Sequence, residues 1–234
     1  MKALSSLYYR YLFLRRNTVA RALVSLIGRP KVPTKKMWDT QYANGHWERL
    51  KDLCEQAHGA VAASYVAYLK PNSSVLEIGC GEGILLPRLR EIGYRAYTGI
   101  DISEFAIGKC RTMADEKTRF IVGDAEQYVP DTPVDVILLN ESIYYFVEPI
   151  ACLCRYAERL APGGVFIVSM FDKERTRPIR RALKETFRVI DETIVSNSKG
   201  TWYCSVLGSE RLNGESSALD GVAQVRVLAG ISEK

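Results

Sequence analysis

Short apolar runs alternate with helix-like segments between residues 74 and 171. The apolar runs are rich in Val, Ile and Leu, and they predict buried strands at residues 74–79, 96–101, 119–124, 134–140 and 165–171. Between them, apolar residues recur at helical spacing, which predicts helices at 84–93, 103–116 and 148–164. Strands that are apolar on both faces and alternate with helices belong to parallel sheets covered on both sides. The pattern therefore predicts an α/β fold with a doubly wound, mostly parallel sheet in three α/β/α layers.

The pattern changes after residue 176. A helical segment at 177–187 precedes two β-rich runs, 188–197 and 201–207, which are separated by a three-residue turn. A connection this short predicts an antiparallel hairpin at the sheet edge, so seven strands are expected. The Gly- and Ser-rich tail 208–234 is expected to be mostly disordered, with a further strand within 222–229 left open.

The first 36 residues differ in character from the rest. Residues 1–28 interrupt every apolar run with arginines, so no stretch approaches the roughly 18 apolar residues of a membrane span, and no secretory cleavage pattern follows. Three interpretations stay open: a helix packed on the domain, a basic amphipathic helix at an anionic membrane surface, or an organelle transit peptide. Pro30 and Pro33 predict a linker before residue 37. The expected organisation is a basic helix and linker at 1–36, a main domain at 37–207 and a tail at 208–234.

Composition and charge add expectations about partners and compartment. The 234 residues, 47% hydrophobic and 25% charged, suit one globular domain. Nine of the 32 Lys and Arg residues precede Asp39, whereas none of the 27 Asp and Glu residues does, so the remaining chain is net acidic. No nucleic-acid partner is expected from such a body. Six cysteines without a CxxC pair, and two histidines, predict reduced thiols and no metal site. We expect a cytoplasmic protein that is either soluble or peripheral at the inner membrane surface.

A glycine-rich stretch, "VLEIGCGEGI" at residues 75–84, follows the first predicted strand directly. Dinucleotide-binding folds use the pattern G-x-G-x-x-G, which starting at Gly79 would require a glycine at position 84. The chain has Ile84 there, and it also has an acid, Glu77, inside the apolar strand. A buried carboxylate repels a pyrophosphate and needs a positive or hydrogen-bonding partner. These residues favour a ligand that carries an ammonium group.

Four motifs together resemble the class I S-adenosylmethionine-dependent methyltransferases, which have a seven-stranded Rossmann-like sheet. These are "VLEIGCGEG", "GIDIS", "FIVGDAEQY" and "LAPGGVFIVS", which appear in order at successive strand ends. The predicted terminal hairpin matches the reversed last strand of that family, and the resemblance covers roughly residues 37–207. The resemblance implies S-adenosyl-L-methionine as cofactor.

The resemblance also implies roles for individual residues. The glycines would let the methionine part of the cofactor approach the backbone, with Glu77 near its ammonium group, and Asp101 would accept hydrogen bonds from the ribose hydroxyls. Asp124 would bind the adenine amino group. Two alternatives stay open, in which Asp101 caps a helix and Asp124 stabilises a turn. The implied cofactor-binding set is Glu77, Gly79, Cys80, Gly81, Asp101, Ile102, Asp124, Ala125 and Asn140.

The acceptor end is expected at "NESIYYF", residues 140–146, and at the upstream segment 37–50. Methyl transfer needs positioning and, for a weak nucleophile, a base. Glu141 is the first candidate base, with His46 and Tyr145 as further catalytic candidates. The tyrosine faces could bind a cationic substrate or could simply pack in the core, and His46 could equally have a packing role. A lid formed by residues 37–50 is expected to contribute Trp38, Tyr42 and His46, and Tyr144 is expected to wall the substrate site.

The expected function is therefore methyl transfer to an oxygen or nitrogen of a small molecule. The acceptor would be a sugar, an amine or another metabolite, either free or presented at a membrane surface. Two alternatives from other classes stay open: an NAD-dependent oxidoreductase, and a non-catalytic methyltransferase-like subunit that serves an active partner. The sequence does not choose between an oxygen and a nitrogen acceptor, nor does it give the oligomeric state.

Overall fold

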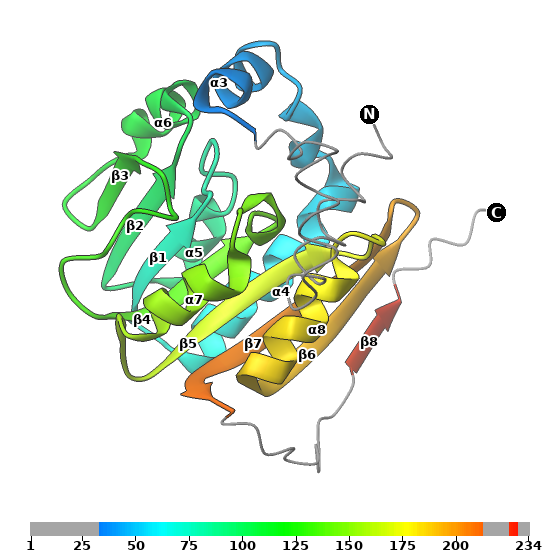
Figure 1. The fold of residues 1–234 in the computed structure, drawn as a ribbon. Helices are drawn as coiled ribbons and strands as arrows, with labels where there is room; N and C mark the ends of the chain where they lie inside the picture. The colour runs from blue at the N-terminus through cyan, green and yellow to red at the C-terminus, as the bar shows by residue number, and fades with distance from the viewer. Residues whose placement is uncertain (1–32, 213–224, 229–234) are drawn as a thin grey trace, which may run out of the picture.

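The structure, a computed structural model, describes residues 33–212 and 225–228 (Figure 1). The predictions for residues 1–32 and for most of the tail lie outside the described residues. The described strands form one sheet in the order β3-β2-β1-β4-β5-β7-β6-β8. Their bounds are Ser74–Ile78 for β1, Ala96–Asp101 for β2, Thr118–Val122 for β3, Val134–Asn140 for β4, Leu160–Phe171 for β5, Phe187–Asn197 for β6, Gly200–Arg211 for β7 and Val225–Leu228 for β8.

Strands β1 to β5 run parallel, and β7 is antiparallel to both β5 and β6. The predicted mostly parallel sheet with a reversed terminal hairpin is thus confirmed. The eighth strand, β8, pairs in parallel with β6 and falls within the segment 222–229, where the sequence left a further strand open.

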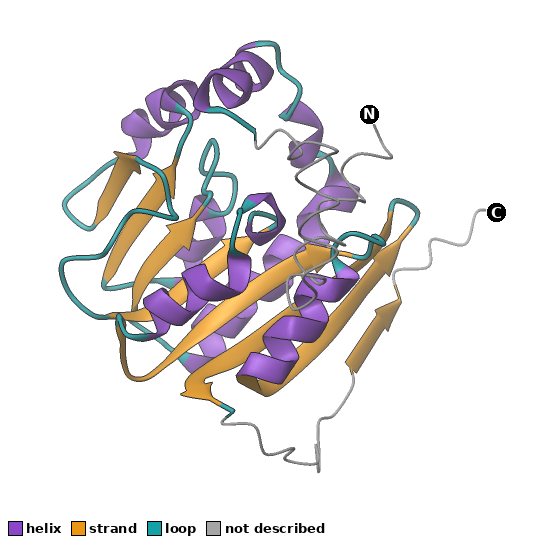
Figure 2. Cartoon of the chain, in the orientation of Figure 1, coloured by secondary structure: helices purple, strands orange, loops and turns teal. Residues whose placement is uncertain are grey.

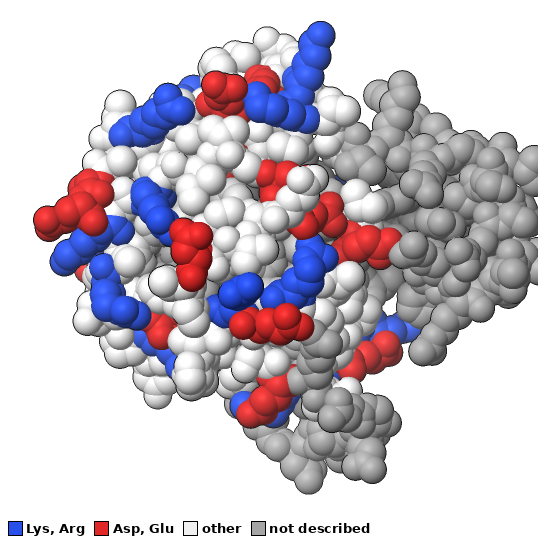
Figure 3. Space-filling view, turned by 60° about the vertical axis from the view of Figure 1, so that its left-hand side comes forward, with Lys and Arg blue, Asp and Glu red and all other residues white. Residues whose placement is uncertain are grey.

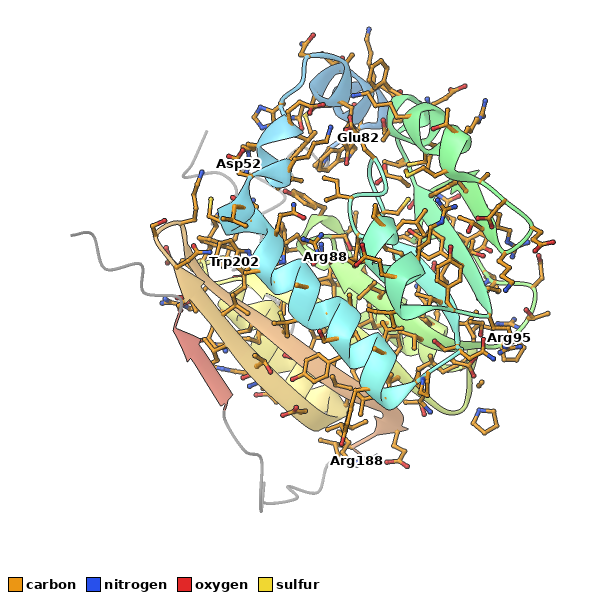
Figure 4. The ribbon with its side chains drawn as sticks, turned by 180° about the vertical axis from the view of Figure 1, so that it is seen from behind. Asp52, Glu82, Arg88, Arg95, Arg188 and Trp202 are labelled. Atoms are coloured by element: carbon orange, nitrogen blue, oxygen red, sulfur yellow. The ribbon has the colours of Figure 1, made fainter. Side chains whose placement is uncertain are left out.

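Helices cover both faces of the sheet (Figures 1 and 2). Helices α7 and α8 lie on one face, while the view from behind shows α4 and α5 across the other (Figure 4). Because these helices sandwich the sheet, the expected three-layer arrangement is confirmed. The helix bounds are Lys35–Ala43 for α3, Leu53–Leu69 for α4, Leu86–Ile92 for α5, Glu104–Cys110 for α6, Pro149–Ala157 for α7 and Arg177–Thr186 for α8; short 3-10 turns span Glu48–Lys51, Arg111–Met113 and Ile143–Tyr145.

Two apolar cores explain the unbroken apolar runs of the central strands. In β4, Ile137 and Leu139 pack on the side of α7 and α8, whereas Val136 and Leu138 pack on the side of α4 and α5. Successive side chains of a strand point to opposite faces, so a strand that is covered on both faces needs apolar residues throughout. Burial on both faces fixes the position of the strand ends, and the predicted site residues lie at those ends.

Several elements differ from the sequence prediction. Helix α3 begins at Lys35, inside the predicted linker, because Thr34 caps it by accepting a hydrogen bond from the Met37 amide. The predicted helix 148–164 ends at Ala157, and the chain enters β5 at Leu160 with an irregularity in its pairing to β4. The long helix α4 was not predicted.

The described surface mixes both signs of charge. On the face drawn in Figure 3, Lys and Arg side chains are interspersed with Asp and Glu side chains. Among the helices of the described residues, none combines the length and the apolar character that a membrane crossing requires.

Candidate functional site

A cavity of about 500 Å³ lies beyond the carboxyl ends of the central parallel strands. A smaller one of about 80 Å³ adjoins it and shares Gly79, Asn140 and Glu141 in its lining. The structure brings nearly all predicted site residues together here. The main cavity is lined by Trp38, Tyr42, Gly79, Asp101, Ile102, Asp124, Ala125, Asn140, Glu141, Tyr144 and Tyr145, and the smaller one by Glu77, Cys80 and Gly81.

The loop after β1 requires its glycines. Gly79 and Gly81 have φ values of +73° and +54°, in the left-handed region that disfavours side chains. A Cβ on Gly79 would lie 2.5 Å from Ser142 Cβ, and a Cβ on Gly81 would lie 2.7 Å from the Tyr42 hydroxyl. The backbone here is therefore left bare at the floor of the cavity.

Asp101 ends β2 and holds the glycine loop in place. One carboxylate oxygen accepts a hydrogen bond from the Gly81 amide at 2.9 Å, and the other accepts one from the Ser103 amide at 2.8 Å. Burial raises the pKa of Asp101, while the backbone hydrogen bonds oppose that shift. Each oxygen keeps one further lone pair for a ligand, so the capping role and the ligand role are compatible.

Asp124 follows β3, the neighbour of β2 in the sheet, and also lines the cavity. Its carboxylate accepts hydrogen bonds from the Glu126 amide at 2.9 Å and from the Gln127 side chain at 3.2 Å. This is the turn-stabilising role that the sequence left open. The Glu126 carboxylate accepts hydrogen bonds from the amides of Val147 and Glu148. These bonds connect the loop after β3 to the loop after β4.

Glu77 has a partner within the protein. The Tyr97 hydroxyl, from β2, donates to its carboxylate at 2.6 Å. Burial raises the pKa of Glu77 to about 7, and the Tyr97 hydrogen bond opposes the shift. Tyr97 is thus the hydrogen-bonding partner that the buried acid requires, and Glu77 also lines the smaller cavity, where the ammonium group of a ligand would be a second partner.

Asn140 belongs to a network that the sequence did not predict. Its side-chain oxygen lies 3.1 Å from His58 Nδ1, which also lies 3.1 Å from Ser169 Oγ. The His58 ring stacks on Trp202 at a centroid distance of 5.0 Å. Burial lowers the pKa of His58 to about 4, so the ring is neutral at pH 7. His58 sits on the unpredicted helix α4, 82 residues from Asn140, so no local pattern could have linked the two.

Glu141 combines backbone strain with a buried carboxyl group. Its φ of +60° is uncommon for a residue other than glycine and costs roughly 1–3 kcal/mol. The Tyr144 hydroxyl donates to Oε2 at 2.8 Å, whereas Oε1 is buried and has no hydrogen-bond partner among the described residues. Burial raises the pKa of Glu141 to about 7, against the opposing effects of the Tyr144 hydroxyl, the Phe171 backbone and the charge of Lys173.

Helix α3 forms a lid anchored to α6. Asp39 accepts hydrogen bonds from the Ser103 hydroxyl at 2.7 Å and the Phe105 amide at 3.1 Å, and Lys35 forms an ion pair with Glu104 at 3.1 Å. The Trp38 ring meets the edge of Tyr145 with centroids 4.8 Å apart. Of the predicted lid residues, Trp38 and Tyr42 line the cavity, as does the predicted substrate residue Tyr144.

At the acceptor end, the structure disfavours two of the alternatives that the sequence left open. His46 is exposed and lines neither cavity, because the chain turns at Gly45, with φ of +68°, before His46. The faces of Tyr144 and Tyr145 are not free for a cationic substrate, since the Arg175 guanidinium lies 5.2 Å and 5.8 Å from their ring centroids.

The glycine loop and the acids at the strand ends agree with the sequence match to known families. The family described as "methyltransferase domain" matches residues 46–206. The chain belongs to the methyltransferase domain family. Its membership and its fold confirm the predicted class, an S-adenosylmethionine-dependent methyltransferase domain with a Rossmann-like sheet.

Individual relatives of this methyltransferase domain differ in substrate. The chain is 29% identical over 146 residues to the ribosomal protein L11 methyltransferase of Thermus thermophilus, covering 60% of this chain and 54% of that protein. It is 34% identical over 104 residues to the ubiquinone biosynthesis O-methyltransferase of a Caulobacter species, covering 42% of this chain and 41% of that protein. The chain thus spans about half the length of the curated relatives it matches.

Solved structures support the fold. The N-methyltransferase NodS from Bradyrhizobium japonicum, in complex with S-adenosyl-L-homocysteine, superimposes with a TM-score of 0.65 at 18% sequence identity. The match covers 75% of this chain and 98% of that one. A likeness at this level of identity identifies the architecture and leaves the acceptor open.

Proposed function

We propose that this protein transfers the methyl group of S-adenosylmethionine to an oxygen or nitrogen of a small molecule, such as a sugar, an amine or another metabolite. The observation that carries this proposal is Glu141, whose buried carboxyl group has one unpartnered oxygen at the edge of the cavity beside the glycine loop. A strained backbone and a raised pKa at one residue are typical of functional sites.

The residues present fit the cofactor. The bare backbone at Gly79 and Gly81 admits an amino-acid moiety, and the free lone pairs of Asp101 suit the two ribose hydroxyls. Asp124 and Ala125 would form the adenine end. A cavity of about 500 Å³ falls within the usual range for small-molecule sites and leaves room for an acceptor.

The bound cofactor supplies a methyl group that its sulfonium already activates for in-line displacement. The protein's task is then to orient the acceptor and take its proton. Glu141 would take the proton that the acceptor oxygen or nitrogen loses when it receives the methyl group. The Tyr144 hydroxyl holds the carboxyl group in place through Oε2.

The lid supports a small acceptor over a macromolecular one. Helix α3 covers the cavity, and Trp38 meets Tyr145 above it, so a large acceptor would have to displace α3. The L11 methyltransferase relatives are the reason to test a protein acceptor directly.

Labelling tests the proposal. Incubation with methyl-labelled cofactor and fractionated host extract is expected to label a small molecule, identified by mass. Label recovered in protein or RNA instead would refute the small-molecule proposal.

Calorimetry separates the alternatives. Heat on adding S-adenosylhomocysteine and none on adding NAD is expected, whereas the reverse would favour the oxidoreductase. Cofactor binding without turnover on any extract would favour the non-catalytic subunit.

Membrane contact through the basic N-terminal residues lies outside the described residues and stays a proposal, as does a cytoplasmic location. Flotation with anionic liposomes, using the full chain and a chain lacking residues 1–30, tests the membrane contact. Loss of binding on truncation is expected if these residues rest on the membrane surface.

A further inference from the structure

The cavity lining is polarised in charge. Asp101, Asp124 and Glu126 line the part formed by the ends of β2 and β3, where the cofactor is proposed to bind. Basic side chains from the loop after β5 and from the β6–β7 turn, Lys173, Arg175 and Lys199, line the other part. The acceptor end is therefore the cationic end of the site.

None of these three cations has a carboxylate partner among the described residues. Neither Lys173 nor Arg175 forms an ion pair within 4.0 Å among the described residues. In contrast, the cavity-lining Arg49 pairs with Glu55 at 3.8 Å, and Lys35 pairs with Asp39 at 2.9 Å. The Arg175 Nε atom is buried and has no hydrogen-bond partner among the described residues. A buried donor of a charged group is costly when left unsatisfied, so a shift of the side chain that lets an anion reach this atom would be favourable.

The two cations are held close to the candidate base. Arg175 lies over the rings of Tyr144 and Tyr145, and Tyr144 donates to Glu141. Lys173 lies over the Phe171 ring at 4.6 Å. Burial and then repulsion from Arg175 lower the pKa of Lys173, which an anion between the two would reverse.

The turn that carries both residues is preorganised. The Thr176 hydroxyl donates to the Phe171 carbonyl at 2.7 Å and accepts from the Lys173 amide at 3.0 Å. Thr176 is buried, which fixes the turn against the end of β5. The next arginine, Arg177, is already satisfied, because it forms two hydrogen bonds with Asp172 and does not line the cavity.

We propose that the methyl acceptor carries an anionic group, a carboxylate or a phosphate, which Lys173 and Arg175 bind while Glu141 faces the nucleophilic oxygen or nitrogen. This inference rests on the proposed function and names its substrate class. Arg175 presents a planar fork of donors that matches either anion. Glu141 lines the same end, so the anion must sit on the Lys173 and Arg175 side of the acceptor rather than beside the base.

The test uses matched probes on protein saturated with S-adenosylhomocysteine. Binding of benzoate is compared with that of benzamide, and binding of phenyl phosphate with that of phenol, by calorimetry or ligand-observed NMR. At least a tenfold preference for an anionic probe is expected, and it should fall about tenfold or more in Lys173→Gln and Arg175→Gln. Preference for benzoate alone identifies a carboxylate, and preference for phenyl phosphate alone identifies a phosphate.

Arg177→Gln is the matched control, because it removes a cation from the same turn without changing the cavity lining. It should keep the preference. Affinity for S-adenosylhomocysteine, measured on all variants, reports on the proposed function separately. If the protein binds S-adenosylhomocysteine but binds anionic and neutral probes equally, the anion proposal alone is overturned. If the unsubstituted protein does not bind S-adenosylhomocysteine, the proposed function is overturned.

The labelled product provides a second measurement. A product from the extract that binds to an anion exchanger at pH 8 supports the anionic acceptor. A labelled product whose mass shows neither a carboxylate nor a phosphate group contradicts it, even when the methyl transfer itself is observed.

Discussion

Glu141 is the residue whose chemistry the proposed function depends on most. A base with a pKa of about 7 is protonated below that pH, so kcat/KM is expected to rise as pH increases through about 7 and then to level off. Glu141→Gln should lower kcat roughly 100-fold or more and remove this rise, with S-adenosylhomocysteine affinity within about twofold. Steady-state rates from pH 5.5 to pH 9 test both expectations.

The control for this substitution is Glu91→Gln, an exposed acid on α5. It should leave both the rate and the pH profile unchanged. A Glu141→Gln enzyme with an unaltered rate would show that another group takes the proton.

Asp101 tests the cofactor end in the same way. Asp101→Ala removes the acceptor of the Gly81 and Ser103 amides together with the proposed ribose contacts. Affinity for S-adenosylhomocysteine should fall by roughly 100-fold, as expected for lost charge-assisted hydrogen bonds. Calorimetry measures this, with circular dichroism to confirm folding. Asp115→Ala, before β3, is the control, and equal affinities of the two variants would refute the role of Asp101.

The sequence predicted which residues line the cavity where those residues lie at the end of a strand. Asp101, Asp124 and Asn140 follow apolar runs whose length determines where each strand stops, and all three line the cavity. The partners of these residues were not predictable. The contacts between Glu77 and Tyr97, and between Asn140 and His58, join residues far apart in the chain, and only the packed sheet and helix α4 bring them together.

At the scale of elements, Asp39 makes the hydrogen bonds that anchor the lid to α6. Hydrogen bonds from Ser103 and Lys35 outweigh partial burial and lower the pKa of Asp39 to about 2, so the anchor is ionised at any assay pH above about 4. Asp39→Ala should release α3, raise the KM for the cofactor severalfold and speed amide hydrogen exchange over residues 35–43.

Asp52→Ala is the comparison for the lid, because Asp52 precedes α4 and makes no side-chain cap hydrogen bond. Its exchange pattern and KM should match those of the unsubstituted protein. Unchanged exchange over α3 in Asp39→Ala would mean that other contacts hold the lid.

Helix α4 shows why one element escaped prediction. Its 17 residues include many apolar ones, but these lie on several sides of the helix and do not form a single stripe, so periodicity gives no clear signal. The helix is nevertheless central to the site, because it buries His58 against Asn140 and packs Ala62, Ala63 and Val66 against the sheet. Packing against distant parts of the chain stabilises this helix, so the residues within the helix segment alone do not predict it.

At the scale of the whole molecule, the buried acid Glu77 makes folding stability depend on pH. Its pKa of about 7 in the folded state lies above the value near 4.5 of an unfolded glutamate. The folded state therefore binds more protons between these pH values, and the stability contribution of Glu77 falls as pH rises from about 4.5 to about 7. Glu77→Gln should gain stability relative to the unsubstituted protein across this window, by on the order of 1–3 kcal/mol.

Chemical unfolding without cofactor at pH 5 and at pH 8 measures that difference. His58, with its pKa lowered to about 4, contributes in the opposite direction, but it is present in both proteins and cancels. A Glu77→Gln protein whose advantage does not grow with pH would show that the carboxylate is fully compensated in the folded state.

The left-handed backbone at Glu141 has a consequence for engineering. Glycine and asparagine adopt this conformation at lower cost than glutamate, so heat selection of a random library should enrich them at position 141. The selected variants would unfold at a higher temperature but have a lower kcat. Stability and activity would therefore conflict at this one position. Directed evolution of this protein for high-temperature use would then require position 141 to be kept as glutamate while the other positions are mutated.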